Sequence, residues 1–254
     1  MADELVGRGV EPGKISLVPN AVDEALFEDH LTAARARERT GVLEVPGFTT
    51  ESFLVGAVSA LVDYEGYDTL LRAVALLLEA RDVSEGLREE IRVVIAGDGV
   101  SRPGLAVLAE ELGISDRVLL PGRVPRAEAR DWVQALDLVV VPRQDVAVTR
   151  AVTPQKPIEA LALNRPVIAS DLPALREVLS GPAGTTYADF FTAGDPRALA
   201  DAIVRRATAE PVDDARAREA STMARERTWA RQVRRYRELY ENLVDDGGGG
   251  DAGF

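Results

Sequence analysis

The sequence contains no cysteine, one histidine and two lysines among its 254 residues. Without cysteine the chain can form no disulfide and use no thiolate nucleophile, which fits a cytoplasmic protein. The lone histidine, His30, matches no motif and is interpreted as a surface residue. We therefore expect neither a Ser-His-Asp triad nor a metal cluster built on histidine and cysteine.

Long apolar runs are also missing. No segment approaches the roughly 20 apolar residues that span a bilayer, and no signal peptide opens the chain. The net charge of -12 and the pI near 4.7 argue against nucleic acid as a partner, because phosphate backbones bind basic surfaces. With 46% hydrophobic residues the chain can bury a sizeable core, and one domain with extensions is the simplest interpretation.

Short apolar segments and amphipathic segments alternate through the middle of the chain. Strands are predicted at 53–59, 91–96, 118–120, 138–141 and 167–169, and helices at 67–80, 103–112, 127–136, 158–163 and 172–179. The run Leu-Val-Val-Val at 138–141 is typical of a strand buried on both faces. This alternation predicts an α/β fold built on a doubly wound parallel sheet.

The flanking segments differ from this middle region. Residues 1–51 are predicted to be a connector and linker, with a short strand at 15–18 and a solvated helix or mobile linker at 31–40. The parallel-sheet domain is assigned to 52–210, and further helices at 198–208, 213–227 and 229–243 lead into a C-terminal helical segment, 211–244. The tail, 245–254, carries four consecutive glycines and is predicted to be disordered.

The stretch 139–177 combines a buried strand, a basic loop and a helix start. Pro142 closes the strand, and the loop that follows carries Arg143 and Arg150. In a parallel sheet, such a loop lies at the carboxyl edge, where ligands of open α/β folds bind.

A helix is predicted to begin near Pro154, with Thr153 as its cap and with Lys156 and Glu159 in its first turns. The N-terminus of a helix presents free N–H groups and the positive end of the helix dipole. The pattern therefore predicts a phosphate site at this helix start.

Two runs resemble a known family. Thr153-Pro-x-Lys-Pro-x-Glu-Ala, followed by Arg165-Pro-Val-Ile-Ala-Ser-Asp171, resembles the donor-binding motif of family 4 (group 1) glycosyltransferases. The run from Lys14 to Asp23, which contains Pro-Asn, resembles their interdomain connector. These enzymes have the GT-B fold, two facing Rossmann-like domains with the active site between them. The resemblance covers nearly the whole chain but only the C-terminal half of the family.

The resemblance implies a retaining-type transferase whose Rossmann-like domain binds a nucleotide sugar. Lys156 and Arg143 would be catalytic, stabilising the charge that develops on the diphosphate leaving group. Glu159 would accept hydrogen bonds from the ribose hydroxyls. Further donor-binding residues are expected in the loop, at Thr153, Pro154, Gln155 and Arg150, and in the base-contacting turn, at Gly122 and Val124.

Plainer interpretations of the same residues stay open. Lys156 and Arg143 could be solvent-facing cations, and Glu159 could only complement the helix dipole. The turn at 122–124 could be an ordinary loop between a strand and a helix.

The sequence departs from the family pattern at three places. Ala151 replaces the first motif glutamate. Ser59-Ala60 and Glu65-Gly66 replace the family's early phosphate-binding cations, so we expect the later loop to bind the phosphates. Separately, the run 97–99, Gly-Asp-Gly, lacks the third glycine of a dinucleotide fingerprint and is interpreted as a turn.

The expected partners are a nucleotide sugar and an N-terminal acceptor domain, on the same or a separate chain; peripheral membrane association through that domain is left open. No metal is expected, because cations and helix N–H groups can meet the phosphate charge. Two alternatives remain: a non-catalytic nucleotide-binding subunit and a sugar-nucleotide epimerase of the same fold. A receiver-like domain is not supported, because no acidic phosphoacceptor pocket is indicated.

Overall fold

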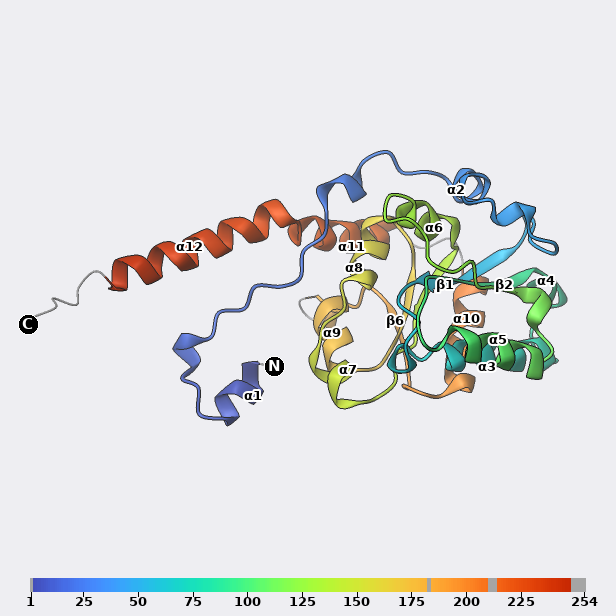
Figure 1. The fold of residues 1–254 in the computed structure, drawn as a ribbon, viewed down its shortest axis with the longest axis horizontal. Helices are drawn as coiled ribbons and strands as arrows, with labels where there is room; N and C mark the ends of the chain where they lie inside the picture. The colour runs from blue at the N-terminus through green and yellow to red at the C-terminus, as the bar shows by residue number, and fades with distance from the viewer. Residues whose placement is uncertain (1, 182–183, 210–213, 248–254) are drawn as a thin grey trace, which may run out of the picture.

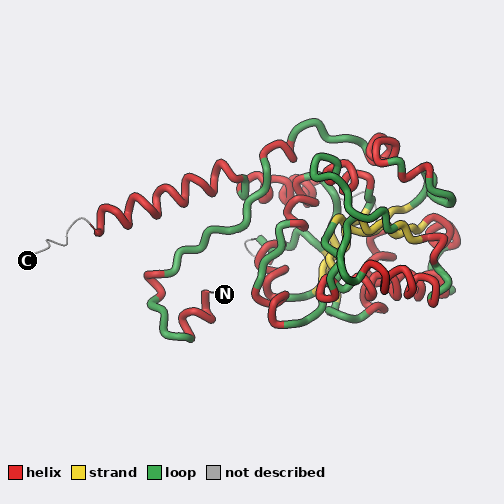
Figure 2. The backbone as a smooth tube through the Cα atoms, in the orientation of Figure 1, coloured by secondary structure: helices red, strands yellow, loops and turns green. Residues whose placement is uncertain are grey.

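The computed structural model describes residues 2–181, 184–209 and 214–247. Within these ranges six parallel strands form one sheet in the order β3-β2-β1-β4-β5-β6 (Figure 2). The strands are β1 (Phe53–Val58), β2 (Ile91–Ala96), β3 (Val118–Leu119), β4 (Leu138–Val141), β5 (Val167–Ser170) and β6 (Asp189–Phe191). The predicted doubly wound parallel sheet is confirmed. Only β6 lies outside the predicted strands, because its three residues begin with a charged one, Asp189, and so do not form an apolar run.

Helices cover both faces of the sheet. One face carries α3 (Tyr67–Glu79), α5 (Arg102–Glu111) and α10 (Pro196–Thr208), and the other carries α6 (Ala129–Ala135), α8 (Lys156–Ala162) and α9 (Pro173–Leu179). Short helices α4 (Glu85–Glu90) and α7 (Ala147–Ala151) lie in loops between these elements.

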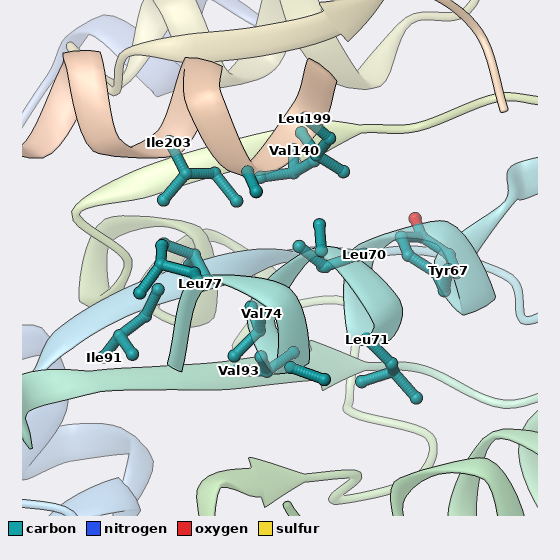
Figure 3. Packing of buried hydrophobic residues seen from close by; sticks show 14 of the residues in the cluster. Tyr67, Leu70, Leu71, Val74, Leu77, Ile91, Val93, Val140, Leu199 and Ile203 are labelled. Carbon is teal, nitrogen blue, oxygen red and sulfur yellow. The ribbon is translucent and has the colours of Figure 1, made fainter. Parts of the chain in front are cut away.

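Side chains of the strands alternate between two hydrophobic cores. In β2, Val93 and Ile95 belong to the core under α3 and α10, whereas Val94 and Ala96 belong to the core under α6, α8 and α9. Figure 3 shows the first core, where leucines of α3 pack against β2 and against side chains of α10. Burial on both faces is the reason that the strands are apolar at consecutive positions.

The arginine-rich segment before the sheet is a helix, as one of the two predicted alternatives had it, but only one of its faces is solvated. It forms α2 (Ala33–Thr40), which packs on α6. Arg37 is 4% exposed and pairs with Asp137, whose Oδ2 also accepts a hydrogen bond of 2.7 Å from the backbone N–H of Leu54. This partner lies 100 residues away along the chain, so the local pattern did not indicate it.

The two ends of the chain leave the domain on the same side (Figure 1). The N-terminal segment carries α1 (Ala2–Gly7), and residues 15–18 form no strand, so that prediction was wrong. At the other end, α11 (Asp214–Glu226) is followed by α12 (Trp229–Gly247), which runs into the predicted tail; 248–254 lie outside the described residues. None of the described helices combines the length and apolar character needed to cross a membrane.

Candidate functional site

The candidate site lies where β1 and β4 run side by side. β1 is followed along the chain by β2 and β3 on one side, and β4 by β5 and β6 on the other. The connections after β1 and β4 therefore leave the sheet in opposite directions, which opens a crevice at their carboxyl ends. The loop 59–66 follows β1, and the loop 142–155 follows β4.

These two loops are packed directly against each other. Gly66 has a φ of 73°, and a Cβ atom at this position would lie 2.0 Å from the carbonyl oxygen of Pro142. The backbone N–H of Gln144 donates a hydrogen bond of 3.0 Å to the carbonyl of Tyr64. Only glycine fits this approach, which brings the side chains of both loops together.

A buried ion pair joins the loops at this point. Arg143 donates from Nη2 and Nε to Oε1 of Glu65, over 2.9 and 3.3 Å, and from Nη1 to the carbonyl of Val152 over 3.0 Å. The side chains of Arg143 and Glu65 are 9% and 5% exposed. All three guanidinium nitrogens are therefore bonded within the protein.

Lys156 approaches the other carboxylate oxygen of Glu65. It is the first residue of α8, and its Nζ donates to Oγ of Ser59 and lies 3.4 Å from Oε2 of Glu65. Burial lowers the pKa of Lys156, and the carboxylate of Glu65 opposes this shift. One carboxylate thus lies between two cations, of which Lys156 is the more exposed.

Lys156 also lines a cavity of about 260 Å³ together with Gln155 and Glu159. Residues of β1 and β4 line it too, and Arg126 does so from the loop before α6. Burial raises the pKa of Glu159, while the charges of Lys156 and Arg126 oppose the shift. Lys156 and Glu159 are one helical turn apart, so both side chains face the same cavity.

A second, open cavity of about 530 Å³ adjoins the first and shares Val58 and Ala129 with it. It lies over the carboxyl ends of β1 and β2, and Arg123, Val124 and the turn 97–99 line it. The carbonyl of Gly122 accepts a hydrogen bond of 2.8 Å from the N–H of Gly97. The Gly-Asp-Gly run is therefore a turn that forms one wall of this cavity.

The start of α8 differs from the prediction. The helix begins at Lys156 rather than near Pro154, and Thr153 does not cap it. Instead, the side chain of Asn20 donates to the carbonyl of Thr153 over 2.8 Å, which connects the N-terminal connector to the loop. Thr153 lies outside the helix, as expected for a residue before a proline, because the proline disfavours helical geometry at the preceding residue.

The other predicted residues are scattered. Pro154 is buried, and Arg150 is exposed and bonds to both carboxylate oxygens of Asp145 at 2.9 Å. The structure thus brings Lys156, Gln155 and Glu159 into one cavity and Val124 into the next, with Arg143 buried beside them. Arg150 belongs to a separate surface ion pair.

Sequence reasoning missed Glu65, Ser59 and Arg126. In the sequence, Glu65 was noted only because it replaces a cation of the family pattern. Its pairing with Arg143 and Lys156 could have been inferred, because two cations that are to be buried need an anion beside them. The described residues contain no group of three His, Asp or Glu side chains that could hold a metal ion. The arrangement suits an anionic ligand beside Lys156 with a hydroxyl-bearing part beside Glu159.

Known proteins resemble this chain in sequence over most of its length. Residues 52–208 match the family model described as glycosyl transferases group 1. Two D-inositol 3-phosphate glycosyltransferases are similar to this chain. The enzyme of Thermomonospora curvata is 30% identical, and the match covers 93% of this chain and 53% of the enzyme's own length. The enzyme of Streptosporangium roseum is 30% identical, and the match covers 96% of this chain and 53% of the enzyme's own length. The chain therefore spans about half the length of these curated relatives.

Solved structures share the fold. HepE of Anabaena in complex with UDP superimposes with a TM-score of 0.74 and 19% identity, over 96% of this chain and 61% of that one. The C-terminal domain of a glycosyl transferase group 1 family protein from Francisella tularensis gives a TM-score of 0.59 and 16% identity, over 80% of this chain and 96% of that one.

Proposed function

Because the chain belongs to the group 1 glycosyltransferase family and has the fold of its C-terminal domain, we propose that it binds the nucleoside diphosphate of a sugar donor in the crevice between β1 and β4. The observation that carries this proposal is that Lys156 and Glu159 face one cavity at the switch point of the sheet. UDP in the structure of HepE supports the ligand class.

Each group has a role that its chemistry suits. Lys156 donates charge-assisted hydrogen bonds to the diphosphate and stabilises it as a leaving group. Glu159 accepts hydrogen bonds from the vicinal hydroxyls of the ribose. The base lies in the adjoining cavity beside Val124, where backbone groups contact its edge. Arg143 contributes its positive charge from below the site, because its donors are already bonded.

The reaction of the whole protein is part of the proposal. We propose that a retaining-type sugar transfer takes place between this domain and an N-terminal domain that holds the acceptor, since the chain spans about half the length of its relatives. A cytoplasmic location and phosphate binding without a metal also belong to the proposal. The proposal that phosphate binds without a metal rests on the cationic charge at the site.

Calorimetric titration of the chain with UDP and GDP, beside uridine, guanosine and pyrophosphate, tests the ligand class. We expect one of the two nucleoside diphosphates to bind more tightly than its nucleoside and more tightly than pyrophosphate, because two subsites are then occupied together. If neither nucleotide binds at concentrations of about 1 mM, the proposed function is wrong; a Kd of this size corresponds to a binding free energy of about 4 kcal/mol in magnitude.

A further inference from the structure

The carboxylate of Glu65 occupies an unusual place for an anion, inside the subsite that is to receive a diphosphate. We propose that Glu65 is a positioning residue of this subsite, which holds Arg143 with one oxygen and orients Lys156 in its charged form with the other. The inference rests on the proposed function in one respect, because it takes Lys156 as the phosphate-binding group.

The geometry divides the carboxylate between the two cations. Oε1 receives both hydrogen bonds from Arg143, and Oε2 faces Nζ of Lys156 and Oγ of Ser59, each at 3.4 Å. Ser59 in turn accepts from Lys156, so the ammonium has two neighbours that point it across the crevice from α8 toward β1. Glu65 is 5% exposed on its side chain, so water does little to screen these interactions.

Without this carboxylate, Lys156 would be a half-buried cation next to another cation. Burial and the charge of Arg143 both lower the pKa of Lys156, while Glu65 and, more weakly, Glu159 raise it. The phenol of Tyr67, under the same loop, stays neutral because burial and the charge of Glu65 raise its pKa. A neutral lysine would offer a phosphate no charge-assisted hydrogen bond, so Glu65 preserves the property that the subsite needs.

A purely structural role for Glu65 gives a different expectation. If Glu65 only held the two loops together through Arg143, its loss would weaken ligand binding equally at every pH. If it keeps Lys156 charged, its loss moves the pH at which Lys156 releases its proton. The protonation of Lys156 therefore separates the two roles.

The chain offers a direct measurement, because Lys14 and Lys156 are its only lysines. NMR of the chain with ¹³C-labelled lysine should show two side-chain signals, and the exposed Lys14 serves as an internal reference. In the unsubstituted chain we expect the pKa of Lys156 to lie below the ordinary lysine value, because its ammonium is partly buried. Glu65→Gln should lower the pKa of Lys156 by a further unit or more, about the effect of losing an opposite charge at this distance.

Asp63→Asn is the matched control. Asp63 lies in the same 3₁₀ turn, is exposed and accepts a hydrogen bond from Ser101 rather than facing Lys156. The substitution changes the net charge by the same amount and should leave the pKa of Lys156 in place. If Glu65→Gln unfolds the chain, Arg143→Gln tests the network from the other side and should raise the pKa of Lys156.

UDP titrations between pH 8 and pH 10 connect the result to function, because the terminal phosphate, whose second pKa is about 6, is almost fully ionised there. Affinity should fall at the pH where Lys156 deprotonates, and this fall should move to lower pH in Glu65→Gln. An unchanged pKa of Lys156 in Glu65→Gln, or in Arg143→Gln where that variant is used, overturns the inference and leaves the proposed function standing. Absence of UDP and GDP binding by the unsubstituted chain overturns the proposed function instead.

Discussion

Replacing Lys156 by alanine removes the positive charge that lines the cavity at the start of α8, where the phosphate is proposed to bind. A hydrogen bond to a charged group contributes about 1.5–3 kcal/mol to binding. The ammonium is already bonded to Ser59 and lies near Glu65, so phosphate binding exchanges partners rather than adding new ones. The side chain is also 35% exposed, which weakens the interaction by solvent screening.

Both effects place the expected loss at the lower end of that range. We predict that Lys156→Ala weakens binding of the preferred nucleoside diphosphate by about 1.5 kcal/mol, roughly tenfold in Kd at 25 °C. Binding of the matching nucleoside should not change, because Lys156 contributes to the phosphate subsite alone.

Isothermal titration calorimetry on the unsubstituted chain, Lys156→Ala and Lys14→Ala tests this prediction. Lys14→Ala makes the same substitution at the other lysine, whose side chain is 74% exposed and pairs with Glu11, and it should bind nucleotide as the unsubstituted chain does. Urea unfolding of Lys156→Ala checks that the fold is retained, because Glu65 keeps its bonds to Arg143. Equal affinities of Lys156→Ala and Lys14→Ala would show that the diphosphate does not bind at Lys156.

Three further expectations follow from the contacts described. Glu159→Gln should weaken the binding of nucleotide and nucleoside alike by about 1 kcal/mol. Burial raises the pKa of Glu159 above its ordinary value of 4.5, so the unsubstituted chain should lose affinity as the pH falls through this pKa, and the substitution should remove that loss. An effect on the binding of diphosphates alone would contradict the ribose role. Arg37→Ala leaves Asp137 buried without its partner and should lower the free energy of unfolding in urea by about 3–5 kcal/mol. Arg35→Ala, on the exposed face of the same helix, should lower it by under about 0.5 kcal/mol. Similar losses in the two variants would mean that the buried pair is unimportant for stability. If the proposed function is right, the purified chain should transfer no sugar from a radiolabelled donor unless the N-terminal half of a relative is added, because the proposed acceptor domain supplies the other wall of the cleft. Transfer at an ordinary enzymatic rate by the chain alone would refute this.

The departures from the family pattern have a structural consequence. Glu65, which the resemblance aligns with a family cation, is neutralised by Arg143 and Lys156 in this structure. These two cations come from the loop after β4 and from α8; that this loop binds the phosphates stays a prediction.

Most of the fold could be predicted from local patterns. Four consecutive apolar residues in β4 indicate a strand buried on both faces, and their alternation with amphipathic helices indicates a parallel sheet. Lys156 and Glu159 are three residues apart, so a helix that begins near Pro154, as predicted, or at Lys156, as observed, places them on one face. These features depend on residues within a few positions of one another, which is the range over which backbone geometry alone fixes side-chain direction.

The tertiary structure decided which distant groups meet. Glu65 contacts Arg143 and Lys156 across 78 and 91 residues, and Arg37 reaches Asp137 across 100. Such contacts depend on β4 pairing with β1 rather than with β3, and on the close approach of Gly66 to Pro142. The periodicity of a segment shows that a strand is buried but not which strand lies beside it, since any apolar neighbour satisfies the same pattern. The sequence by itself thus determined most of the helices and strands and placed Lys156 and Glu159 on one face of a helix, and the order of the strands decided that one buried carboxylate lies between its two cations.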